Sequence, residues 1–246
     1  MGLGAEFARQ LAARGENLYL TARTDELLRA LAAELTSRHG NIRVETFRCD
    51  LSEPDAAGRI AADLAARGLR PRWLVNNAGF GDAGSFRNMA PGRVTACLMV
   101  NVVALTELAR LLIPRMKSGD RIVNVASTAS FQPVPYFNVY SASKAYVLSF
   151  SEALHEELLG EGIHVLCLCP GPTATNFGTN NGMDAAAFEK GQSSEKVVRA
   201  GLGASDRNKA IQLMQRRLAI TALRAIPRVV VRKAAGSVAK RFKTAD

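Results

Sequence analysis

Paired cysteines are lacking in this sequence, and their lack argues against two common kinds of site. The four cysteines, Cys49, Cys97, Cys167 and Cys169, form no Cys-x-x-Cys pair of the kind found in redox motifs and zinc sites. Cys167 and Cys169 lie two residues apart in an expected strand, so they share one face and cannot easily bridge. We therefore expect four buried free thiols and no metal site.

Targeting and membrane signals are lacking as well. The opening residues, MGLGAEFARQ, contain no basic region followed by an apolar block, which a signal peptide would have. The uninterrupted apolar runs are too short to span a bilayer. No linker, low-complexity segment or internal repeat divides the chain. We expect one domain, located in the cytoplasm.

Acidic residues are scarce in the C-terminal segment, which holds the protein's net charge of +10. Residues 207–246 contain eleven Lys and Arg but one acid, whereas residues 1–206 carry 21 of each sign. We predict a domain over residues 1–206 and a basic helical extension of that same domain over residues 207–246. A high isoelectric point alone suggests nucleic-acid binding, but no recognition motif supports it, so we expect no nucleic-acid partner.

What is present is an alternation of strands and helices, which is typical of a doubly wound α/β fold of the Rossmann type. Several strand segments are near-continuous apolar runs, as parallel strands covered on both faces should be. Strands are expected at Asn17–Ala22, Ile42–Cys49, Trp73–Asn76, Arg121–Ala126 and His164–Cys169. Helices are expected at Ala5–Arg14, Asp25–Arg38, Asp55–Arg67, Val94–Met116 and Tyr140–Leu159.

Two strands of such a fold are not evident. The chain enters its first helix after only Met1–Gly4, although a doubly wound dinucleotide fold needs a first strand there, in the middle of the sheet. Residues 208–214 have no convincing strand pattern, so we expect no last strand either. We expect Met1 to lie inside a longer coding sequence. The alternative is a genuine short form with a damaged phosphate-binding turn.

Weak signals of a dinucleotide site stand at suitable places along the chain. Gly2, Leu3 and Gly4 lie directly before a helix, where glycines allow a phosphate to approach the backbone, although two glycines near a terminus are commonplace. Arg23 follows the strand at 17–22, where an arginine suits a ribose 2′-phosphate. A solvated arginine is the alternative there.

Further polar and small residues would continue this site at the ends of the next strands. Asp50, followed by Leu51, could accept a hydrogen bond from an adenine amine. Asn76 could tie adjacent strands together through its amide. It precedes three residues that would let a cofactor lie against the backbone, namely Asn77, Ala78 and Gly79.

Tyr140 and Lys144 are the strongest catalytic signal. Their spacing of four puts both on one helical face. A nearby ammonium would lower the tyrosine pKa from about 10, so that the phenol could exchange a proton with a substrate oxygen. Such a pair alone is more often a solvated helix face. Ser127, however, ends a strand where ligands bind in this architecture and could donate to the same oxygen.

Together these residues resemble the short-chain dehydrogenases/reductases from residue 1 to about residue 200. The matching pieces are Gly2-Leu3-Gly4, Asn76–Gly79, Asn101, Ser127, Tyr140 with Lys144, and Pro170-Gly171 followed by Thr175. The likeness extends to bacterial reductases of loose specificity and to the ketoacyl and 17β-hydroxysteroid types. Asn101 is polar within an apolar helix, and without the resemblance a hydrogen-bonded core asparagine would explain it.

The resemblance implies a role for each matching side chain. Tyr140 would be the acid/base, and Ser127 would polarise the carbonyl. Lys144 would bind the nicotinamide ribose and lower the tyrosine pKa, while Asn101 would hold a water in a proton relay. The nicotinamide would be flanked by three further residues, Pro170, Gly171 and Thr175.

The implied activity is an NADP(H)-dependent interconversion of a carbonyl and a secondary alcohol, with NAD(H) as a second option. Its substrate is expected to be an apolar small molecule of a ketoacyl, steroid-like or similar type. This rests on Phe131, Tyr136, Phe137, Phe177, Met183 and Phe188. A homodimer or homotetramer is expected. The alternative is a non-catalytic binding or scaffold protein of the family, with an incomplete cofactor site.

The basic extension interleaves two apolar stretches, Leu218–Leu223 and Val229–Val231, with cations. The cations are Arg216, Arg217, Arg224, Arg228, Arg232, Lys233, Lys240 and Arg241. Pro227 should interrupt any continuous helix. A basic amphipathic segment can lie on an anionic membrane, so peripheral membrane contact is one expectation. A pair of helices packed on the domain or at a subunit contact is the alternative.

Overall fold

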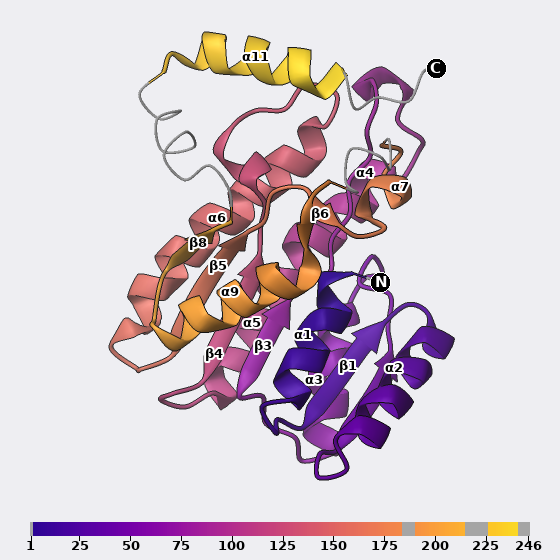
Figure 1. Cartoon of the computed structure of the whole chain (residues 1–246), viewed down its shortest axis with the longest axis vertical. Helices are drawn as coiled ribbons and strands as arrows, with labels where there is room; N and C mark the ends of the chain where they lie inside the picture. Colours follow the sequence, from indigo (N-terminus) through magenta and orange to yellow (C-terminus); the bar gives the residue numbers. More distant parts are fainter. Residues whose placement is uncertain (1, 184–189, 215–225, 241–246) are drawn as a thin grey trace.

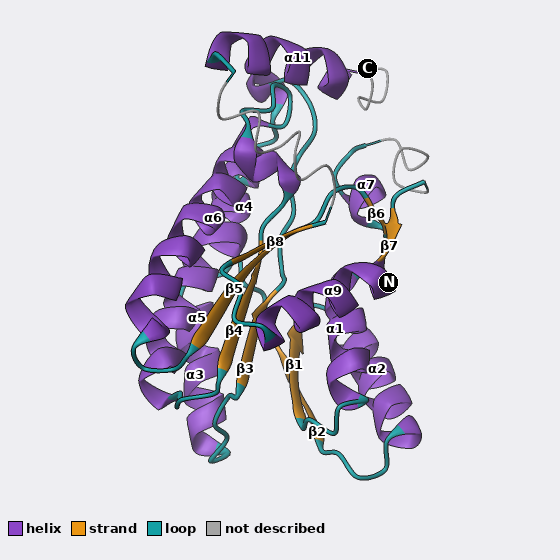
Figure 2. Cartoon of the chain, turned by 60° about the vertical axis from the view of Figure 1, so that its left-hand side comes forward, coloured by secondary structure: helices purple, strands orange, loops and turns teal. Residues whose placement is uncertain are grey.

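Parallel strands form the centre of this protein, and helices cover both of their faces (Figures 1 and 2). The computed structural model describes residues 2–183, 190–214 and 226–240. Parallel pairing follows from the alternation of strand and helix, because each helix carries the chain back to the edge at which the previous strand began.

The helices and strands have the following bounds. The strands are β1 (Leu18–Ala22), β2 (Val44–Arg48), β3 (Trp73–Asn76), β4 (Arg121–Val125), β5 (His164–Cys169), β6 (Thr173–Ala174), β7 (Gln192–Ser193) and β8 (Ile211–Leu213). The α-helices within the described residues are α1 (Leu3–Ala12), α2 (Asp25–Arg38), α3 (Ala56–Ala66), α4 (Arg93–Leu98), α5 (Ala104–Leu112), α6 (Asn138–Leu159), α7 (Phe177–Asn180), α9 (Ser194–Asp206) and α11 (Arg228–Lys240).

The main sheet is divided into two groups of hydrogen-bonded strands. One group is β1–β2, and the other has the order β3–β4–β5–β8. Within the described part of the chain, no strand pairs with the second edge of β1 or with the second edge of β3. The parallel strand pairs, with helices on both faces, confirm the predicted fold class.

Two helical layers enclose the sheet, as Figure 2 shows. Helices α1, α2 and α9 lie on one face, and α3, α5 and α6 lie on the other. On the first face, Phe7 and Leu202 pack with buried strand residues such as Leu168. On the second face, Ile60 and Leu112 pack with Ile122 and its neighbours. These apolar cores fix the strand ends, where the predicted site residues lie.

Most predicted elements are present with small shifts of their ends. The strand at Trp73–Asn76, the strand at His164–Cys169 and the helix at Asp25–Arg38 have the predicted bounds. The four cysteines are free and buried, as expected. The sequence pattern predicted these strands because parallel strands that are buried on both faces carry near-continuous apolar residues.

The long helix predicted over Val94–Met116 is interrupted. A π-helical turn, Met99–Val103, separates α4 from α5, and a short 3₁₀ turn, Ile113–Arg115, follows. Residues 93–115 as a whole are long and apolar enough to cross a membrane, contrary to the expectation from uninterrupted runs. A core helix has the same composition, and α5 packs against α3 inside the molecule.

The expectation that no strand follows α9 was wrong. Ile211–Leu213 form β8, which pairs in parallel with Cys167–Cys169 of β5. Three residues are too few for a period of two to be recognised in a sequence, and the pairing with β5 supplies the backbone partners that stabilise them. The division of the chain at residue 206 remains a prediction, although β8 brings residues 211–213 into the sheet.

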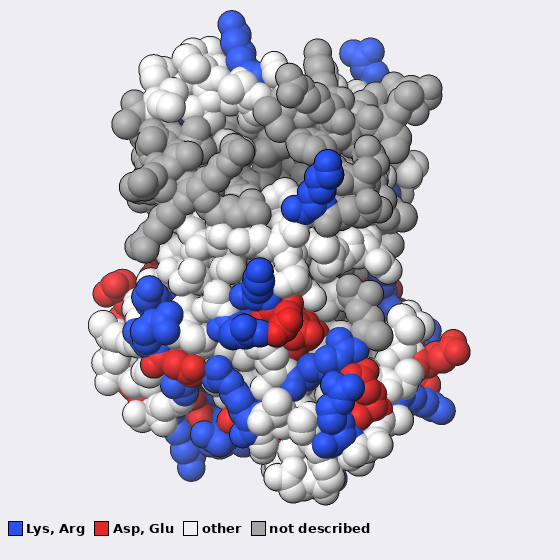
Figure 3. Space-filling view, viewed as in Figure 1, with Lys and Arg blue, Asp and Glu red and all other residues white. Residues whose placement is uncertain are grey.

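Helix α11 begins directly after Pro227, where the sequence predicted an interruption. It buries Val231 and Ala235 and leaves Val229 and Val230 exposed. On the face drawn in Figure 3, acidic and basic side chains intermix away from α11, whereas the described part near α11 shows Lys and Arg alone. The other predicted features of the extension lie outside the described residues, namely Leu218–Leu223, Arg216, Arg217, Arg224 and Arg241.

Candidate active site

A single cavity of about 1810 Å³ brings the predicted site together. All the predicted cofactor-binding residues line it, together with Ser127, Tyr140 and Lys144. These are Gly2, Leu3, Gly4, Arg23, Asp50, Leu51, Asn77, Ala78, Gly79, Pro170, Gly171 and Thr175. Most follow the carboxyl ends of parallel strands, which is where ligands bind in open α/β sheets. Asn101 is the one predicted site residue that does not line the cavity.

Ser127 is held by the turn that follows β4. Its hydroxyl oxygen accepts a hydrogen bond from the backbone N–H of Ala129 at 3.1 Å, so it caps the short 3₁₀ turn Thr128–Phe131. Ser130 completes that cap and donates to the Lys144 carbonyl at 2.8 Å. The end of β4 is thereby fastened to α6, which carries the other catalytic candidates.

Tyr140 lies on the buried face of α6, and its hydroxyl hydrogen-bonds with Ser127. Burial raises the pKa of Tyr140 above its ordinary value, and the Ser127 hydrogen bond offsets this only in part. The sequence had predicted a lowered pKa. The direction differs because the Lys144 ammonium donates to the Val125 carbonyl at 2.8 Å. It lies 5.7 Å from the centre of the Tyr140 ring.

Lys144 is 3% exposed, so its amine has little contact with solvent. Burial lowers the pKa of Lys144 to about 8, because the charged form loses its hydration. The helical spacing of four holds it beside Tyr140 on the cavity wall, as predicted. A buried ammonium with one carbonyl partner retains donors for a second acceptor, such as a hydroxyl of a bound molecule.

Asn101 lies in the π-helical turn between α4 and α5 and is fully buried. Its carboxamide accepts from the Phe80 N–H at 3.0 Å and donates to the Phe80 carbonyl at 2.8 Å. It also donates to the Ser143 hydroxyl of α6 at 2.9 Å. Asn101 thus fixes the segment after β3 against α6, from behind the cavity wall. π-Helical turns are frequent at functional sites.

Gly79 lies against both Asn101 and Lys144. A Cβ atom placed on Gly79 would lie 3.0 Å from the Lys144 ammonium and 3.1 Å from the Asn101 carboxamide oxygen. These two polar groups therefore approach the backbone of residue 79 so closely only because it has no side chain.

Asn76 has the structural role that the sequence predicted. Its amide donates to the side-chain oxygen of Asn124 on β4 at 2.9 Å, and Asn124 donates to Ser151 on α6 at 2.9 Å. This buried chain of hydrogen bonds joins two strands to a helix. It leaves the next residues, from Asn77 onward, to line the cavity.

Two arginines adjoin each other at the ends of β1 and β2. Arg23 follows β1 and is exposed, and its carbonyl accepts from the Arg48 side chain at 3.1 Å. Nearby, Asp50 accepts from both the N–H and the hydroxyl of Ser52. Burial acts to raise the pKa of Asp50, but those hydrogen bonds and the two cations outweigh it, so the pKa is lowered. Arg48 was not predicted, because no motif marks it.

An aromatic group borders the catalytic end of the cavity. The Phe137 ring stacks on Tyr140 at 4.4 Å, and the Phe177 ring lies 5.4 Å from it. Phe177 begins α7, where its N–H donates to Thr175. Of the other residues named for the substrate face, Tyr136 and Met183 also line the cavity. Phe131 packs in the core instead, and Phe188 lies outside the described residues.

Asn181 is a buried anchor that the sequence analysis missed. Its side-chain oxygen accepts from the Gly81 N–H at 2.5 Å, and its amide donates to the Phe177 carbonyl. Its backbone carbonyl accepts from Ala83. Asn181 therefore holds the segment carrying Phe177 against the loop after β3. Its partners in the loop after β3 lie 98 to 100 residues away along the chain, so no local pattern identifies this contact.

The lining of the cavity suits a dinucleotide. Cations stand at one end, and a tyrosine, a serine and a lysine stand at the other. Between them, Gly4 faces Asn77 so closely that a Cβ on residue 4 would lie 2.7 Å from the Asn77 amide. Small residues therefore form the narrow middle of the site. Among the described residues, no cluster of side chains could hold a metal ion.

Known proteins of one family resemble this chain in sequence. The family model described as short chain dehydrogenase matches residues 1–186. A very-long-chain 3-oxoacyl-CoA reductase of Phaeosphaeria nodorum is 35% identical over 172 residues, covering 68% of this chain and 50% of that protein. A sulfoacetaldehyde reductase of Chromohalobacter salexigens is 36% identical over 193 residues, covering 76% and 75%.

Solved structures agree with this grouping. A short-chain dehydrogenase from Sphingobium yanoikuyae in complex with NADPH has a TM-score of 0.80 and 29% identity, covering 100% of this chain and 94% of that one. The chain spans about half the length of the first curated relatives it matches. The match of the family model over residues 1–186 shows that this chain belongs to the short-chain dehydrogenase/reductase family.

Proposed function

We propose that this protein is an oxidoreductase that moves a hydride between NADP(H) and a carbonyl or secondary alcohol. One observation carries the proposal. Ser127, Tyr140 and Lys144, which come from a strand end and a helix, line the same cavity as Arg23, whose carbonyl accepts a hydrogen bond from the neighbouring Arg48. Reactive groups at one end and cations at the other match a nicotinamide dinucleotide lying between them.

The side chains can perform the proton half of such a reaction. The cofactor would supply or take the hydride. Ser127 and Tyr140 hydrogen-bond to each other, so both hydroxyls can address one carbonyl oxygen. Burial keeps Tyr140 protonated, which suits a general acid in carbonyl reduction. Lys144 has donors left for a ribose hydroxyl, and Asn101 holds the wall behind it in place.

The preference for NADP(H) rests on Arg23. A planar guanidinium suits a phosphate, and Arg48 adds a second cation beside it. The Sphingobium yanoikuyae structure is a complex with NADPH, which supports the same cofactor here. NAD(H) remains a second option to be measured beside it.

The proposed substrate is an apolar small molecule that carries a ketone or secondary alcohol. Phe137, Phe177, Tyr136 and Met183 line the cavity around Tyr140. Val231 and Ala235 of α11 line it as well, so an apolar helix face closes this end. The name of the Phaeosphaeria relative, a very-long-chain 3-oxoacyl-CoA reductase, is consistent with a ketoacyl substrate. The flanking aromatics fit a steroid-like one equally.

A non-catalytic binding protein is the second candidate. The observation in its favour is the division of the sheet, which lies beside Gly2, Leu3 and Gly4, where a phosphate would bind. An assay of the reduction of aliphatic, aromatic and steroid ketones separates the two candidates. Turnover is measured as the loss of NADPH absorbance. NADPH binding without turnover of any ketone by protein purified under mild conditions would favour the second.

Two surfaces support proposals about partners. Leu98, Val103 and Tyr146 are exposed apolar or aromatic residues around α4, α5 and α6. We propose that this face, defined by those three residues, joins subunits in a homodimer or homotetramer. Light scattering on wild type and on Val103→Glu tests this. A monomeric wild-type protein at micromolar concentration would contradict it.

Peripheral contact with an anionic membrane is proposed for α11. Its exposed Val229 and Val230 adjoin three cations, Arg228, Arg232 and Lys233, each worth about 1 kcal/mol near such a surface. Co-sedimentation with anionic vesicles at low and high salt tests this, with a chain ending at Met214, which keeps β8, as control. Equal sedimentation of both chains would contradict it. A location in the cytoplasm stays a prediction from the sequence.

A further inference from the structure

Tyr136 has a backbone conformation that its residue type seldom adopts. Its φ angle is +64°, and among the described residues only Asp55 and Asn208 share a positive φ without being glycine. Aspartate and asparagine tolerate this left-handed region, whereas a bulky side chain there is a genuine outlier. Such a residue persists only where the surrounding structure holds it, and residues of this kind cluster at active sites and ligand clamps.

Contacts with the loop after β3 hold Tyr136 in this conformation. Its carbonyl accepts a hydrogen bond from the Gly84 N–H at 2.9 Å. The next residue, Phe137, is 6% exposed, and its N–H donates to the Val134 carbonyl at 3.1 Å. The Phe137 ring lies so close to Gly81 that a Cβ on that glycine would lie 2.4 Å from it. The loop after β3 therefore fixes the chain at Tyr136 and at the residue that follows it.

The same loop is held from its other side. We call residues 81–84 of this loop the clasp. The Asn181 side chain accepts from the Gly81 N–H at 2.5 Å, and its backbone carbonyl accepts from the Ala83 N–H at 3.0 Å. Asn181 is 1% exposed, and its amide also donates to the Phe177 carbonyl. The clasp thus joins the turn before α6 to the segment that carries Phe177, and it fixes the two relative to each other.

The Tyr136 side chain lies at the substrate end of the cavity. It is half-buried, and it lines the cavity together with Phe177 and Met183. The adjacent residue, Phe137, stacks on Tyr140 with 4.4 Å between the ring centres. Tyr136 is therefore one residue away from a ring that contacts the proposed acid/base. Because the clasp fixes its backbone, the direction in which the Tyr136 side chain leaves the chain is fixed as well.

The turn itself does not need a tyrosine. Glycine adopts a positive φ without steric cost, and asparagine adopts it more readily than most residues do. The hydrogen bond from Gly84 goes to the backbone carbonyl of residue 136, so any residue at this position could accept it. A tyrosine here makes the turn less stable and adds an aromatic surface to the cavity. A role for that surface explains the tyrosine, and the turn alone does not.

We propose that Tyr136 is a specificity-determining residue, which packs its aromatic face against a ring of the substrate beside the reacting carbonyl. The inference rests on the proposed function, because it assumes a ketone that is reduced at Tyr140. Aromatic rings attract each other when their centres lie about 4.5–7 Å apart. A tyrosine has few rotatable bonds, and its fixed backbone reduces the entropy that binding would lose. Aryl ketones are thus preferred over linear ketones of equal size, which have no rigid face.

The test compares two ketones of equal carbon number. Acetophenone carries an aromatic ring beside its carbonyl, and hexyl methyl ketone is linear. The full chain is compared with four variants, Tyr136→Phe, Tyr136→Leu, Tyr136→Ala and Tyr136→Gly. The first keeps the ring, the second keeps apolar volume without a ring, and the last two remove the side chain. The measured quantity is the ratio of kcat/KM for acetophenone to kcat/KM for hexyl methyl ketone, so that effects common to both substrates cancel.

We expect Tyr136→Phe to keep this ratio within about twofold of wild type. The Leu, Ala and Gly variants should lower it by roughly three- to tenfold, which is the range that an aromatic pair contributes beyond its buried area. The loss should lie chiefly in the KM for acetophenone, because the ring would be packed in the ground state and the transition state alike.

Two further measurements do not depend on turnover. Acetophenone is titrated by calorimetry into the protein with NADP⁺, a pair that cannot react because both partners are oxidised. Its dissociation constant should rise roughly three- to tenfold in the Leu, Ala and Gly variants. Urea unfolding then compares Tyr136→Gly with Tyr136→Ala. The Gly variant should have the greater folding equilibrium constant, by about two- to fivefold, because only glycine relieves the positive φ.

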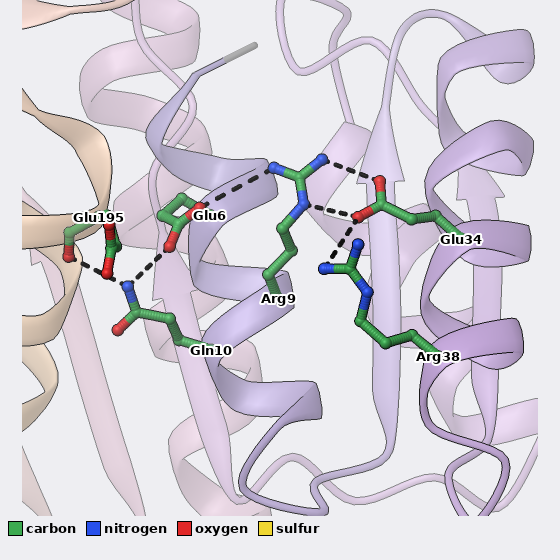
Figure 4. A network of polar contacts seen from close by, with 6 residues as sticks. All are labelled: Glu6, Arg9, Gln10, Glu34, Arg38 and Glu195. Carbon is green, nitrogen blue, oxygen red and sulfur yellow. Dashed lines mark hydrogen bonds and ion pairs between the residues drawn. The ribbon is translucent and has the colours of Figure 1, made fainter.

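Two control variants separate this role from a general loss of structure. Gln10→Ala removes hydrogen bonds to Glu6 at 2.7 Å and to the Glu195 carbonyl at 3.0 Å, which join α1 to α9 (Figure 4). It should lower stability and leave the ketone ratio unchanged. Phe86→Ala removes an aromatic ring that is 59% exposed on the loop after β3, and it should not change the ratio either. Neither Gln10 nor Phe86 is among the described residues that line the cavity.

Other outcomes would overturn the proposal. An unchanged ratio in Tyr136→Ala, or an equal fall in Gln10→Ala, would refute it. A ratio that rises in Tyr136→Ala would show that Tyr136 excludes rings. An equal fall in the Phe and Leu variants would assign the effect to the hydroxyl and refute packing by the ring. Greater stability of Tyr136→Ala than of Tyr136→Gly would refute the strain on which the argument depends.

A failure of the proposed function gives a different result. A wild-type protein that reduces neither ketone would count against the proposed function alone. Titration of acetophenone without cofactor then decides the inference about Tyr136. Weaker binding to Tyr136→Ala than to wild type would support it, and equal or undetectable binding would refute it.

Discussion

The Asn101 side chain pairs with the backbone of Phe80 as a neighbouring strand would, accepting from its N–H at 3.0 Å and donating to its carbonyl at 2.8 Å. Phe80 directly follows the small residues that line the cavity after β3. Because the π-helical turn places Asn101 behind that segment, one buried carboxamide determines where Gly79 lies relative to Lys144. Asn101 thus acts on the site through the backbone.

Asn101→Ala should therefore destabilise the protein and loosen the site together. Two backbone groups of Phe80 would lose their partner, each at a cost of about 1–3 kcal/mol if it stays buried. We expect the free energy of unfolding by urea to fall by roughly 2–4 kcal/mol. Asn88→Ala, at an exposed position, is the control. A loss below about 0.5 kcal/mol would show that the Phe80 groups find other partners.

Tyr140→Phe should abolish turnover while leaving NADPH affinity within about twofold, because only the proton-transferring hydroxyl is removed. General acid–base catalysis typically contributes 10²–10⁴-fold, so we expect kcat to fall by about that factor. The matched control is Tyr146→Phe, on the same helix, whose hydroxyl contacts Thr106 outside the cavity. Wild-type turnover in Tyr140→Phe would refute the assignment of the acid/base.

Local sequence patterns predicted the parts of the site that depend on one element. Tyr140 and Lys144 fall on one buried face because four residues make about one helical turn. Ser127 and Asn77 reach the cavity because parallel strands end at a common edge. The Asn76 amide joins two strands for the same reason.

Contacts between distant segments could not be predicted in this way. Asn181 binds Gly81 across a hundred residues, and Arg48 reaches Arg23 only because β1 and β2 pair. The direction of the Tyr140 pKa shift was missed for a related reason. Spacing places a lysine near the phenol, but burial and the turn of Lys144 toward Val125 decide the sign.

Arg23→Asp should reverse or remove the preference for NADP(H). The carboxylate would repel a 2′-phosphate and accept hydrogen bonds from a free 2′-hydroxyl instead. We expect the ratio of kcat/KM for NADPH over NADH to fall by at least about tenfold, since the change replaces one charged contact by another of opposite sign. Arg29→Asp makes the same charge change on α2, outside the cavity. An equal fall in that control would show a long-range effect of charge.

Gly79→Ala should impair the site because of the space that its side chain would take. The added Cβ would lie 3.0 Å from the Lys144 ammonium and 3.1 Å from Asn101, so one of these groups must move. We expect the NADPH dissociation constant to rise and stability to fall by about 1–3 kcal/mol, as overpacking usually costs. Gly40→Ala, with open space around it, is the control. Unchanged NADPH affinity in Gly79→Ala would contradict the close packing of Gly79 against Lys144 and Asn101.

Lys144 should make stability rise with pH over a defined window. Burial lowers its pKa from 10.5 to about 8. Between these values the unfolded chain holds the proton that the folded chain has released, so this group's contribution to stability increases as pH rises. Below pH 8 both states are protonated, and the unfavourable contribution of the buried charge is constant. A pKa shift of this size corresponds to an increase of about 3 kcal/mol in the free energy of unfolding between the two pKa values.

The variant Lys144→Met isolates this effect, because it keeps an unbranched side chain that is only one atom shorter and removes its titration. The comparison must be a difference between wild type and variant, since burial raises the pKa values of Cys49 and Cys97 and so acts in the opposite direction over part of the same range. Urea unfolding at successive pH values should show that difference changing by up to about 3 kcal/mol in favour of wild type as pH rises from 8 to 10.5. Lys196→Met, which replaces an exposed lysine on α9, is the control. A flat difference for Lys144→Met would mean that the ammonium of Lys144 keeps its hydration in the folded protein, and that the cavity wall at Gly79 admits water.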